Sequence, residues 1–348
     1  MRAWVLHGAG DLRLEEVKKP VPGDKEVLVG VKAAGICGSD IPRICRTGAH
    51  THPLIPGHEF SGVVEALGPG ISPQWQGRRV GIFPLLPCKI CRPCQEKQYE
   101  MCRNYSYLGS RRDGGFAPYV SVPVWNLLPL PDEVTFEEAA MLEPMAVAVH
   151  ALRRARVSPK ETAAVCGLGT IGLLLAMFLK EAGTAAVLTI GNKEMQRQMV
   201  QRLGFPEDAF CDCRHQDAKA WLLERTAGRG ADVFFECVGK KETCSLAIQN
   251  TAVQGKTILV GNPHSDMELE KEIYWKILRN QLRISGTWNS SFFHDALDDW
   301  HYVFERLEKK KISPADLITH RFALEELEKA VRIMENRTED YVKMMLAV

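Results

Sequence analysis

Val165-Cys166-Gly167-Leu168-Gly169-Thr170-Ile171-Gly172 is a glycine-rich turn between a short apolar run and a segment with helical spacing. It matches the pattern G-x-G-x-x-G, in which the first glycine forms a tight turn and the second lets the backbone approach a pyrophosphate. The third glycine allows close packing of helix on strand, and the helix N-terminus then faces the anion. Between a strand and a helix, this pattern predicts a dinucleotide site. A glycine-rich turn that binds no ligand is the weaker alternative.

The segments after this turn alternate between strand-like and helix-like patterns. In chain order we expect a strand at 186–190, helices at 193–203 and 217–226, a strand at 232–236, a helix at 241–250, and strands at 257–260 and 282–286. Strands that alternate with helices are typical of a parallel, doubly wound sheet. The sequence therefore predicts a nucleotide-binding domain over residues 151–286.

The N-terminal part of the chain has the pattern of a β-rich domain. Short strand-like runs bounded by glycine and proline lie at 26–32, 62–66, 79–83 and 116–122. Such runs suggest a partly open barrel or sandwich. A helix is expected at 136–155, helices at 295–309 and 324–336, and a strand at 343–348 that could return to this first domain. We therefore expect residues 1–150 and 287–348 to form one domain, with the nucleotide-binding domain inserted.

Charge and hydropathy exclude several classes of protein. The formal net charge is +1, whereas nucleic-acid binders usually carry a strongly basic face. The longest apolar run, 163–179, is interrupted by glycines and reads as strand, turn and helix rather than as a membrane span. We also see no start that resembles a signal peptide. Eleven cysteines, an odd and clustered set, fit a reducing compartment, and we expect a cytoplasmic protein.

Four of these cysteines form a lobe at 84–103, inside the β-rich domain. Their pattern is Cys88-x-x-Cys91-x-x-Cys94 followed by Cys102, the spacing of a closed structural zinc site. An iron–sulfur cluster usually places its fourth cysteine three residues on and follows it with proline, and here neither holds. A zinc-ribbon nucleic-acid module fits less well, because the lobe lies within a β domain.

A second metal site is indicated by Cys37 and His58, each flanked by glycine. A thiolate, an imidazole and one more protein ligand form the open site that catalytic zinc uses. Two carboxylates are candidates for the third ligand. Glu59 adjoins His58, and Glu143 precedes Pro144 at the entry to an expected helix, where the proline restricts its backbone.

The tip of the second nucleotide-domain strand bears on the choice of cofactor. This position normally holds an acid that bonds the ribose 2′-hydroxyl of NAD. Here the strand ends in Gly191-Asn192-Lys193, with Arg197 one turn further. Glycine leaves room, and the polar and basic side chains could hold a 2′-phosphate, so we predict a preference for NADP over NAD. The alternative is that Lys193 and Arg197 only solvate a helix start.

Together these motifs resemble the zinc-dependent medium-chain dehydrogenases of the polyol type, and the resemblance covers essentially the whole chain. Cys37-Gly38-Ser39-Asp40, Gly57-His58-Glu59, the four-cysteine lobe, Glu143-Pro144 and the glycine-rich turn occur in the family's order. The resemblance implies an α/β protein with a GroES-like β-rich catalytic domain and a Rossmann domain. It implies two zinc ions per chain, NAD(P) and a homodimer or homotetramer. In it, Cys37, His58 and Glu143 match the catalytic ligands, and Cys88, Cys91, Cys94 and Cys102 the structural ones.

Within that family, the segments around Arg43, 84–88, 109–117 and 285–289 resemble the galactitol-1-phosphate 5-dehydrogenases. The expected reaction is oxidation of a secondary alcohol of a polyol phosphate to a ketose phosphate, with hydride transfer to NAD(P). Free polyols such as sorbitol, or threonine, are alternative substrates, and a nucleotide-binding protein without catalysis is the alternative class. The expected substrate-binding residues are Arg43, His50, Arg111, Arg112 and Trp288.

The same resemblance suggests how protons move near the metal. Ser39, two residues after a ligand, is placed to receive the substrate's hydroxyl proton. Asp40 is a candidate to fix the ring of His58. Related alcohol dehydrogenases often place a relay histidine where this chain has Pro42. His50, or Glu59 with water, could substitute, and the sequence leaves that choice open.

Overall fold

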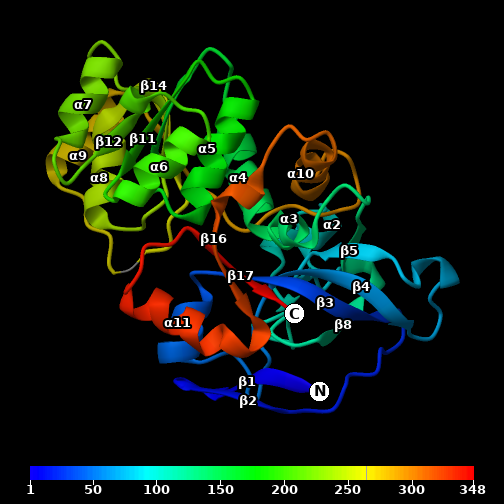
Figure 1. Ribbon diagram of the computed structural model, residues 1–348. Helices are drawn as coiled ribbons and strands as arrows, with labels where there is room; N and C mark the ends of the chain where they lie inside the picture. Colours follow the sequence, from blue (N-terminus) through cyan, green and yellow to red (C-terminus); the bar gives the residue numbers. More distant parts are fainter. Residues whose placement is uncertain (264) are drawn as a thin grey trace. The chain divides into compact units, whose positions relative to one another are not determined.

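The computed structural model describes residues 1–263 and 265–348, and its contacts divide the chain into two compact units. The first unit comprises Met1–Glu143 with Ser291–Val348, and the second is the continuous stretch Pro144–Ser290. The second unit is a parallel sheet with helices, and the first is built mainly from antiparallel strands (Figure 1). The expected fold class, α/β with a β-rich domain and a doubly wound nucleotide-binding domain, is confirmed.

The second unit contains a six-stranded sheet in the order β12-β11-β10-β13-β14-β15, with every neighbouring pair parallel. Numbered along the chain, this order is 3-2-1-4-5-6, the arrangement of the Rossmann fold. The strands are β10 (Thr162–Cys166), β11 (Ala186–Gly191), β12 (Phe210–Asp212), β13 (Ala231–Glu236), β14 (Thr251–Leu259) and β15 (Arg283–Gly286). The order reverses between β10 and β13, so a ligand crevice is expected at the carboxyl ends of these two strands.

Helices pack against this sheet (Figure 1). In α5, the residues from Gly172 to Leu179 are all buried, which explains the long apolar run read from the sequence. Besides α4 (Leu142–Ala155), most of which belongs to this unit, its helices are α5 (Thr170–Glu181), α6 (Glu194–Arg202), α7 (Ala218–Arg225), α8 (Lys241–Asn250) and α9 (Lys271–Arg279). The sequence patterns did not predict α9 or the short strand β12.

The first unit is organised around β3, which pairs antiparallel with three strands, β4, β8 and β17. Its seven-stranded sheet has the order β16-β17-β3-β4-β5-β9, with β8 paired to β3. The strands are β3 (Glu26–Ile36), β4 (Glu59–Leu67), β5 (Arg79–Ile82), β8 (Tyr119–Pro123), β9 (Leu127–Pro129), β16 (Ile318–Ala323) and β17 (Lys343–Ala347). Because β17 pairs with β3, the C-terminal segment is part of this sheet.

Smaller elements complete this unit. Two small antiparallel sheets are formed by β1 (Arg2–Gly8) with β2 (Asp11–Glu16) and by β6 (Leu85–Leu86) with β7 (Ser106–Tyr107). Its short helices are α1 (Asp40–Pro42), α2 (Arg92–Gln95), α3 (Phe136–Ala140), α10 (Asp299–Glu308) and α11 (Leu327–Asn336). A core that includes Trp4, Phe60 and Phe116 is buried between these elements.

The single helix expected at 136–155 is wrong. The structure has α3 and then α4 (Leu142–Ala155), with Met141 as the C-cap between them. Pro144 explains the break, because proline fits the first turn of a helix but lacks the N–H that an interior position requires. The division between the two units also falls here, at Glu143 and Pro144. No helix in the described ranges is long and apolar enough to cross a membrane.

Candidate functional site

Cys37, His58 and Glu59 form one cluster, with ligand atoms that all lie within 4.8 Å of one another. Cys37 follows the end of β3, and Glu59 begins β4, whose first residue pairs with Gly35 of β3. The antiparallel register therefore brings together two segments that are far apart in the sequence. His58 and Glu59 are buried, and Cys37 is half-buried. A thiolate, an imidazole and a carboxylate in this arrangement are the donor set of an open zinc site.

Glu59 also pairs with the ammonium group of Lys343, which sequence reasoning had missed. Lys343 Nζ donates to Glu59 Oε2 and to the carbonyl oxygen of Ile36, the latter at 3.2 Å. Both side chains are 1% exposed. A Cβ at Gly35 would lie 2.4 Å from Glu59 Oε2, so glycine makes space for this ion pair. Lys343 thus brings a positive charge to a buried, anionic cluster.

Glu143 is held beside this cluster by a tyrosine. Tyr107 Oη donates to Glu143 Oε1 at 3.0 Å, and the Tyr107 ring lies edge-on to His58 with ring centroids 5.8 Å apart. Burial raises the pKa of Glu143, and repulsion from Glu59 adds to the effect, although His58 opposes it. Among the described residues, Glu59 rather than Glu143 groups with Cys37 and His58. The crowding of buried anionic groups fits a site for a divalent cation.

Asp40 contacts both His58 and the backbone of Cys37. It is fully buried, and its Oδ1 lies 2.6 Å from Arg43 Nη1 and 3.3 Å from His58 Nδ1. Its Oδ2 accepts from the backbone N–H of Cys37 at 3.0 Å. Burial alone would raise the pKa of Asp40, but His58 and Arg43 hold it below its usual value. Ser39 Oγ donates to Cys37 Sγ at 3.3 Å, so its hydroxyl lies at the proposed ligand.

The basic residues expected to bind a phosphate do not all have the same surroundings. Burial, with the positive charges of Arg111 and Arg43, holds the pKa of His50 below its usual value, so these three groups act on one region. Arg111 stacks on Tyr105, with its guanidinium 4.7 Å from the ring centroid.

Arg112 and Trp288, the other two expected substrate residues, have different surroundings from Arg111. Arg112 Nη2 donates to Glu26 Oε1 at 2.6 Å, which gives this guanidinium a partner within the sheet. Trp288 belongs to the second unit, where its side chain is exposed. Arg111 is therefore a better phosphate candidate than Arg112.

The four cysteines of the lobe converge. The sulfur of Cys91 lies 3.5 Å from that of Cys94 and 3.9 Å from that of Cys102, and the sulfurs of Cys88 and Cys94 are 4.0 Å apart. Four sulfurs about 2.3 Å from a tetrahedral zinc would be separated by about 3.8 Å. Backbone N–H groups of Arg103 and Cys94 lower the pKa of Cys91 to about 6, which favours the thiolate that binds metal. The donor set and its geometry fit a closed zinc site.

In the second unit, the glycine-rich turn connects β10 to α5. Gly167 has a φ of +94°, a conformation that favours glycine, and its N–H donates to the Ile190 carbonyl oxygen at 3.0 Å. A Cβ at Gly167 would lie 2.5 Å from Cγ2 of Val238, so this turn packs tightly on the loop after β13. Gly169 caps α5, and Thr170 is its first residue. The N-terminus of this helix therefore lies at the end of the glycine-rich turn, a position typical of anion binding.

The side chain of Gln196 occupies the space next to Gly191 at the tip of β11. A Cβ there would lie 2.5 Å from Gln196 Oε1, which accepts from the backbone N–H of Asn192 at 2.8 Å. Arg197 stacks on Phe210, with its guanidinium 5.0 Å from the ring centroid. An acidic side chain at position 191 would therefore require Gln196 to move.

Sequence comparison identifies the family. The protein-family model for the alcohol dehydrogenase GroES-like domain matches residues 23–132, and the family model for zinc-binding dehydrogenases matches residues 170–309. Galactitol 1-phosphate 5-dehydrogenase of Escherichia coli (strain K12) is 33% identical over 95% of this chain and 96% of the relative. The chain belongs to the zinc-dependent polyol dehydrogenases. It is therefore an enzyme that uses zinc and a nicotinamide cofactor.

Solved structures agree with this membership. Galactitol-1-phosphate dehydrogenase from Escherichia coli superposes on this dehydrogenase with a TM-score of 0.92 at 32% identity, covering 100% of both chains. A zinc-binding dehydrogenase from Sinorhizobium meliloti 1021, bound to NADP, gives a TM-score of 0.91 at 27% identity, covering 100% of this chain and 99% of that one. The dehydrogenase thus shares its fold with relatives over its whole length.

Asp212 and Arg214 lie near the tip of β11 in the dehydrogenase, and the sequence did not predict this position for either. Asp212 ends β12, is buried, and accepts from Arg214 Nε at 2.9 Å and Nη2 at 2.6 Å. Arg197 Nη2 lies 3.9 Å from the same carboxylate. The short strand β12 carries no periodic pattern, so only the pairing of Gly191 with Asp212 in the sheet reveals their proximity.

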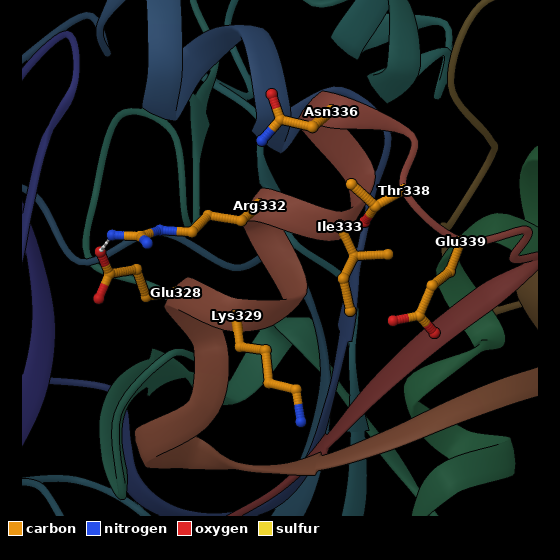
Figure 2. A pocket seen from close by; sticks show the side chains of 7 residues that line it. All are labelled: Glu328, Lys329, Arg332, Ile333, Asn336, Thr338 and Glu339. Carbon is orange, nitrogen blue, oxygen red and sulfur yellow. Dashed lines mark hydrogen bonds and ion pairs between the residues drawn. The ribbon is translucent and has the colours of Figure 1, made fainter.

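A cavity of about 380 Å³ lies on α11 of the dehydrogenase, and its lining contains none of the metal or nucleotide candidates (Figure 2). Ile333 lines it together with charged side chains, and Arg332 Nη2 donates to Glu328 Oε1 across one helical turn. Lys329 pairs with Glu326 at 3.8 Å. Local ion pairs account for the charges at this surface, and we assign it no ligand.

Proposed function

We propose that this dehydrogenase oxidises a secondary hydroxyl of a polyol phosphate, similar to galactitol 1-phosphate, to a ketose phosphate. The reaction class follows from the family, and the finer substrate is our proposal. The observation that carries it is Arg111, whose guanidinium stacks on Tyr105 in the same unit as the metal cluster, whereas Arg43 is already bound to Asp40. The relative that is 33% identical is a galactitol 1-phosphate 5-dehydrogenase, which supports a polyol phosphate as the substrate.

Cys37, His58 and Glu59 would hold the catalytic zinc, with Glu143 as the neighbouring carboxylate. When bound, zinc acts as a Lewis acid that lowers the pKa of a hydroxyl group. Asp40 orients the ring of His58 and the backbone of Cys37.

Ser39 would accept a hydrogen bond from the substrate hydroxyl while its own hydroxyl donates to Cys37 Sγ. The cysteines of the lobe would hold the second, structural zinc. The glycine-rich turn would place the pyrophosphate at the N-terminus of α5.

We predict that Arg111→Ala raises the KM for the polyol phosphate about tenfold or more, because a hydrogen bond to a charged group contributes about 1.5–3 kcal/mol. The KM for the free polyol should change less than about twofold, since that substrate has no phosphate. Steady-state kinetics with galactitol 1-phosphate, galactitol, sorbitol and threonine would measure both effects.

In the same assay, Arg112→Ala should raise the KM for the polyol phosphate less than Arg111→Ala does, because Glu26 already binds the Arg112 guanidinium. Arg332→Ala on α11 is the control for loss of a surface charge. An equal rise of KM for phosphorylated and free polyol would reject the phosphate role of Arg111. Turnover of sorbitol in preference to every phosphorylated polyol would reject the proposed substrate class.

We further propose that the cofactor is NADP, bound through its 2′-phosphate by Lys193, Arg197 and the newly found Arg214. Gln196 occupies the space next to Gly191, and Asp212 binds the guanidinium of Arg214 while Arg197 lies 3.9 Å from the same carboxylate. An arginine near this strand accommodates the 2′-phosphate of NADP in Rossmann domains.

The corresponding prediction is that Arg197→Ala lowers kcat/KM for NADP about tenfold and leaves that for NAD within about twofold. The reason is that only NADP carries the phosphate that Arg197 would contact. Kinetics with both cofactors at saturating alcohol would measure the ratio. A clear preference of the unmodified enzyme for NAD would contradict the proposal, and Arg202→Ala, at the end of α6, serves as the charge control.

The enzyme is also proposed to be a homodimer, or a tetramer built from dimers. β15 is the last strand in the order of its sheet, and nearby side chains are exposed, with Trp275 at 45%, Leu278 at 51% and Ile284 at 37%. An apolar sheet edge of this kind is covered in stable proteins. Light scattering should give a mass of at least two chains, and Ile284→Asp should reduce it to one. A monomeric unmodified enzyme would reject this assembly.

We propose that the enzyme is cytoplasmic, because its cysteines form no disulfide among the described residues. Within the described residues, all eleven cysteines are free thiols. Seven of the eleven belong to neither the four-cysteine lobe nor a disulfide, and free thiols persist in reducing compartments. Cell fractionation would test the location.

A further inference from the structure

Glu236 is a buried carboxylate to which neither the zinc site nor the expected nucleotide motif assigns a function. It is the last residue of β13 and is 1% exposed. β13 and β10 are neighbours, with Cys166 opposite Glu236, so this carboxylate lies at the point where the strand order reverses. Ligands of doubly wound sheets bind at the carboxyl ends of the strands at that point.

The carboxylate of Glu236 is fully used by the turn that follows it. Its Oε1 accepts from the N–H of Val238 at 2.8 Å, from the N–H of Gly239 at 2.9 Å and from Thr243 Oγ1 at 2.7 Å. Its Oε2 accepts from the N–H of Gly239 at 3.2 Å. These donors stabilise a buried negative charge and fix the backbone of 237–239 in one position.

The turn fixed in this way is in contact with the glycine-rich turn. Val238 Cγ2 occupies the space that a side chain at Gly167 would need, because a Cβ at Gly167 would lie only 2.5 Å from it. In addition, the N–H of Cys237 donates to the carbonyl oxygen of Cys166 at 2.8 Å. The position of Val238 therefore sets the position of Gly167, whose backbone the pyrophosphate must approach.

We propose that Glu236 is a positioning residue for the nicotinamide cofactor, which acts by holding Val238 against Gly167. The inference rests on the proposed function only in that the enzyme binds NAD(P), and it does not depend on the substrate. Glutamine in place of Glu236 keeps one acceptor oxygen but directs an amide NH₂ group at the N–H of Gly239. The oxygen that remains can still accept from this N–H, but a buried donor now faces it and the negative charge is lost, so the bonds that hold the turn are weakened.

The test is the binding of NADPH and NADH to the full-length enzyme, followed by nicotinamide fluorescence without alcohol present. Glu236→Gln should raise both Kd values about tenfold or more and leave the zinc content unchanged. Thr243→Val, which removes one donor to Glu236 and also the acceptor for the N–H of Lys240, should raise them about threefold, and Thr243→Ser should restore them. In steady state, the KM for the cofactor should rise more than the KM for the alcohol.

Thr226→Val is the matched control, because Thr226 is also a buried side chain that fixes a turn of this unit. Its Oγ1 donates to the Leu222 carbonyl oxygen at 2.8 Å and accepts from the N–H of Gly230 at 3.0 Å, just before β13 begins. This variant should lower Tm without changing either Kd.

Several results would overturn the inference. One is a Glu236→Gln enzyme that loses thermal stability but binds both cofactors within twofold of the unmodified enzyme. Another is an equal loss of affinity in Thr226→Val. If Glu236→Gln does not fold, unchanged Kd values in Thr243→Val decide against the proposal. An unmodified enzyme that binds neither cofactor would instead reject the proposed function itself.

Discussion

Replacing Cys37 by serine is expected to lower kcat/KM on the order of 10³-fold and to remove one of the two bound zinc ions. A serine hydroxyl is a poor zinc ligand at neutral pH, so the cluster of Cys37, His58 and Glu59 would lose its thiolate. The second zinc should stay, because the four cysteines of the lobe form a separate set. Metal analysis of the purified variant, with kinetics on the same sample, measures both effects.

The carboxylate variants decide which glutamate completes the site. Glu59→Gln should remove the catalytic zinc, whereas Glu143→Gln should retain it, because Glu143 is bound by Tyr107 outside the cluster. The reverse pattern would show that Glu143 is the ligand, as the family resemblance implies. Cys45→Ser is a control for the thiol-to-hydroxyl change. If Cys37→Ser retained two zinc ions and full activity, the assignment of the catalytic site would be wrong.

Replacing Lys343 by methionine is expected to lower the free energy of unfolding by about 3–5 kcal/mol. Lys343 and Glu59 are each 1% exposed, so the variant would leave a carboxylate buried without its cationic partner. The effect should be larger after zinc has been removed with a chelator, since the metal would otherwise compensate Glu59. Urea unfolding, followed by tryptophan fluorescence with and without chelator, gives both values.

Two comparisons isolate the buried charge. Arg332→Met removes an ion pair with side chains 70% and 56% exposed, and should cost less than about 1 kcal/mol. The double variant with Glu59→Gln and Lys343→Met should recover part of the lost stability, because it removes the uncompensated charge. If Lys343→Met were no more destabilising than Arg332→Met, the pair would have no such role.

Much of the fold could be predicted because its signals are local. The glycine-rich turn and the alternation after it gave the doubly wound sheet, since each strand and helix there carries its own apolar pattern. The lobe was equally accessible, because its four cysteines lie within a short segment and their spacing alone suits one ion. Cys37 and His58 could be paired for their residue types, although nothing in the sequence fixes the distance between them.

What escaped prediction depends on partners that are distant in the chain. Lys343 reads as an ordinary strand residue, and only the pairing of β17 with β3 brings it to Glu59. Tyr107 meets Glu143 for the same kind of reason, and Asp212 lies on a strand too short to show periodicity. Glu236 did carry a signal, because a lone carboxylate at the end of an apolar strand must find donors, and this signal was overlooked.

The chain order of β17 has a consequence for how the enzyme matures during synthesis. Lys343 follows Glu59 by 284 residues, and the whole of the nucleotide-binding unit is translated between them. At about 5–20 residues per second, a ribosome needs about 15–60 s to cover that interval. The continuous Rossmann unit can therefore fold on the ribosome, whereas the sheet that carries the metal ligands waits for its last strand. A nascent chain would expose the thiol of Cys37 and the carboxylate of Glu59 throughout that time.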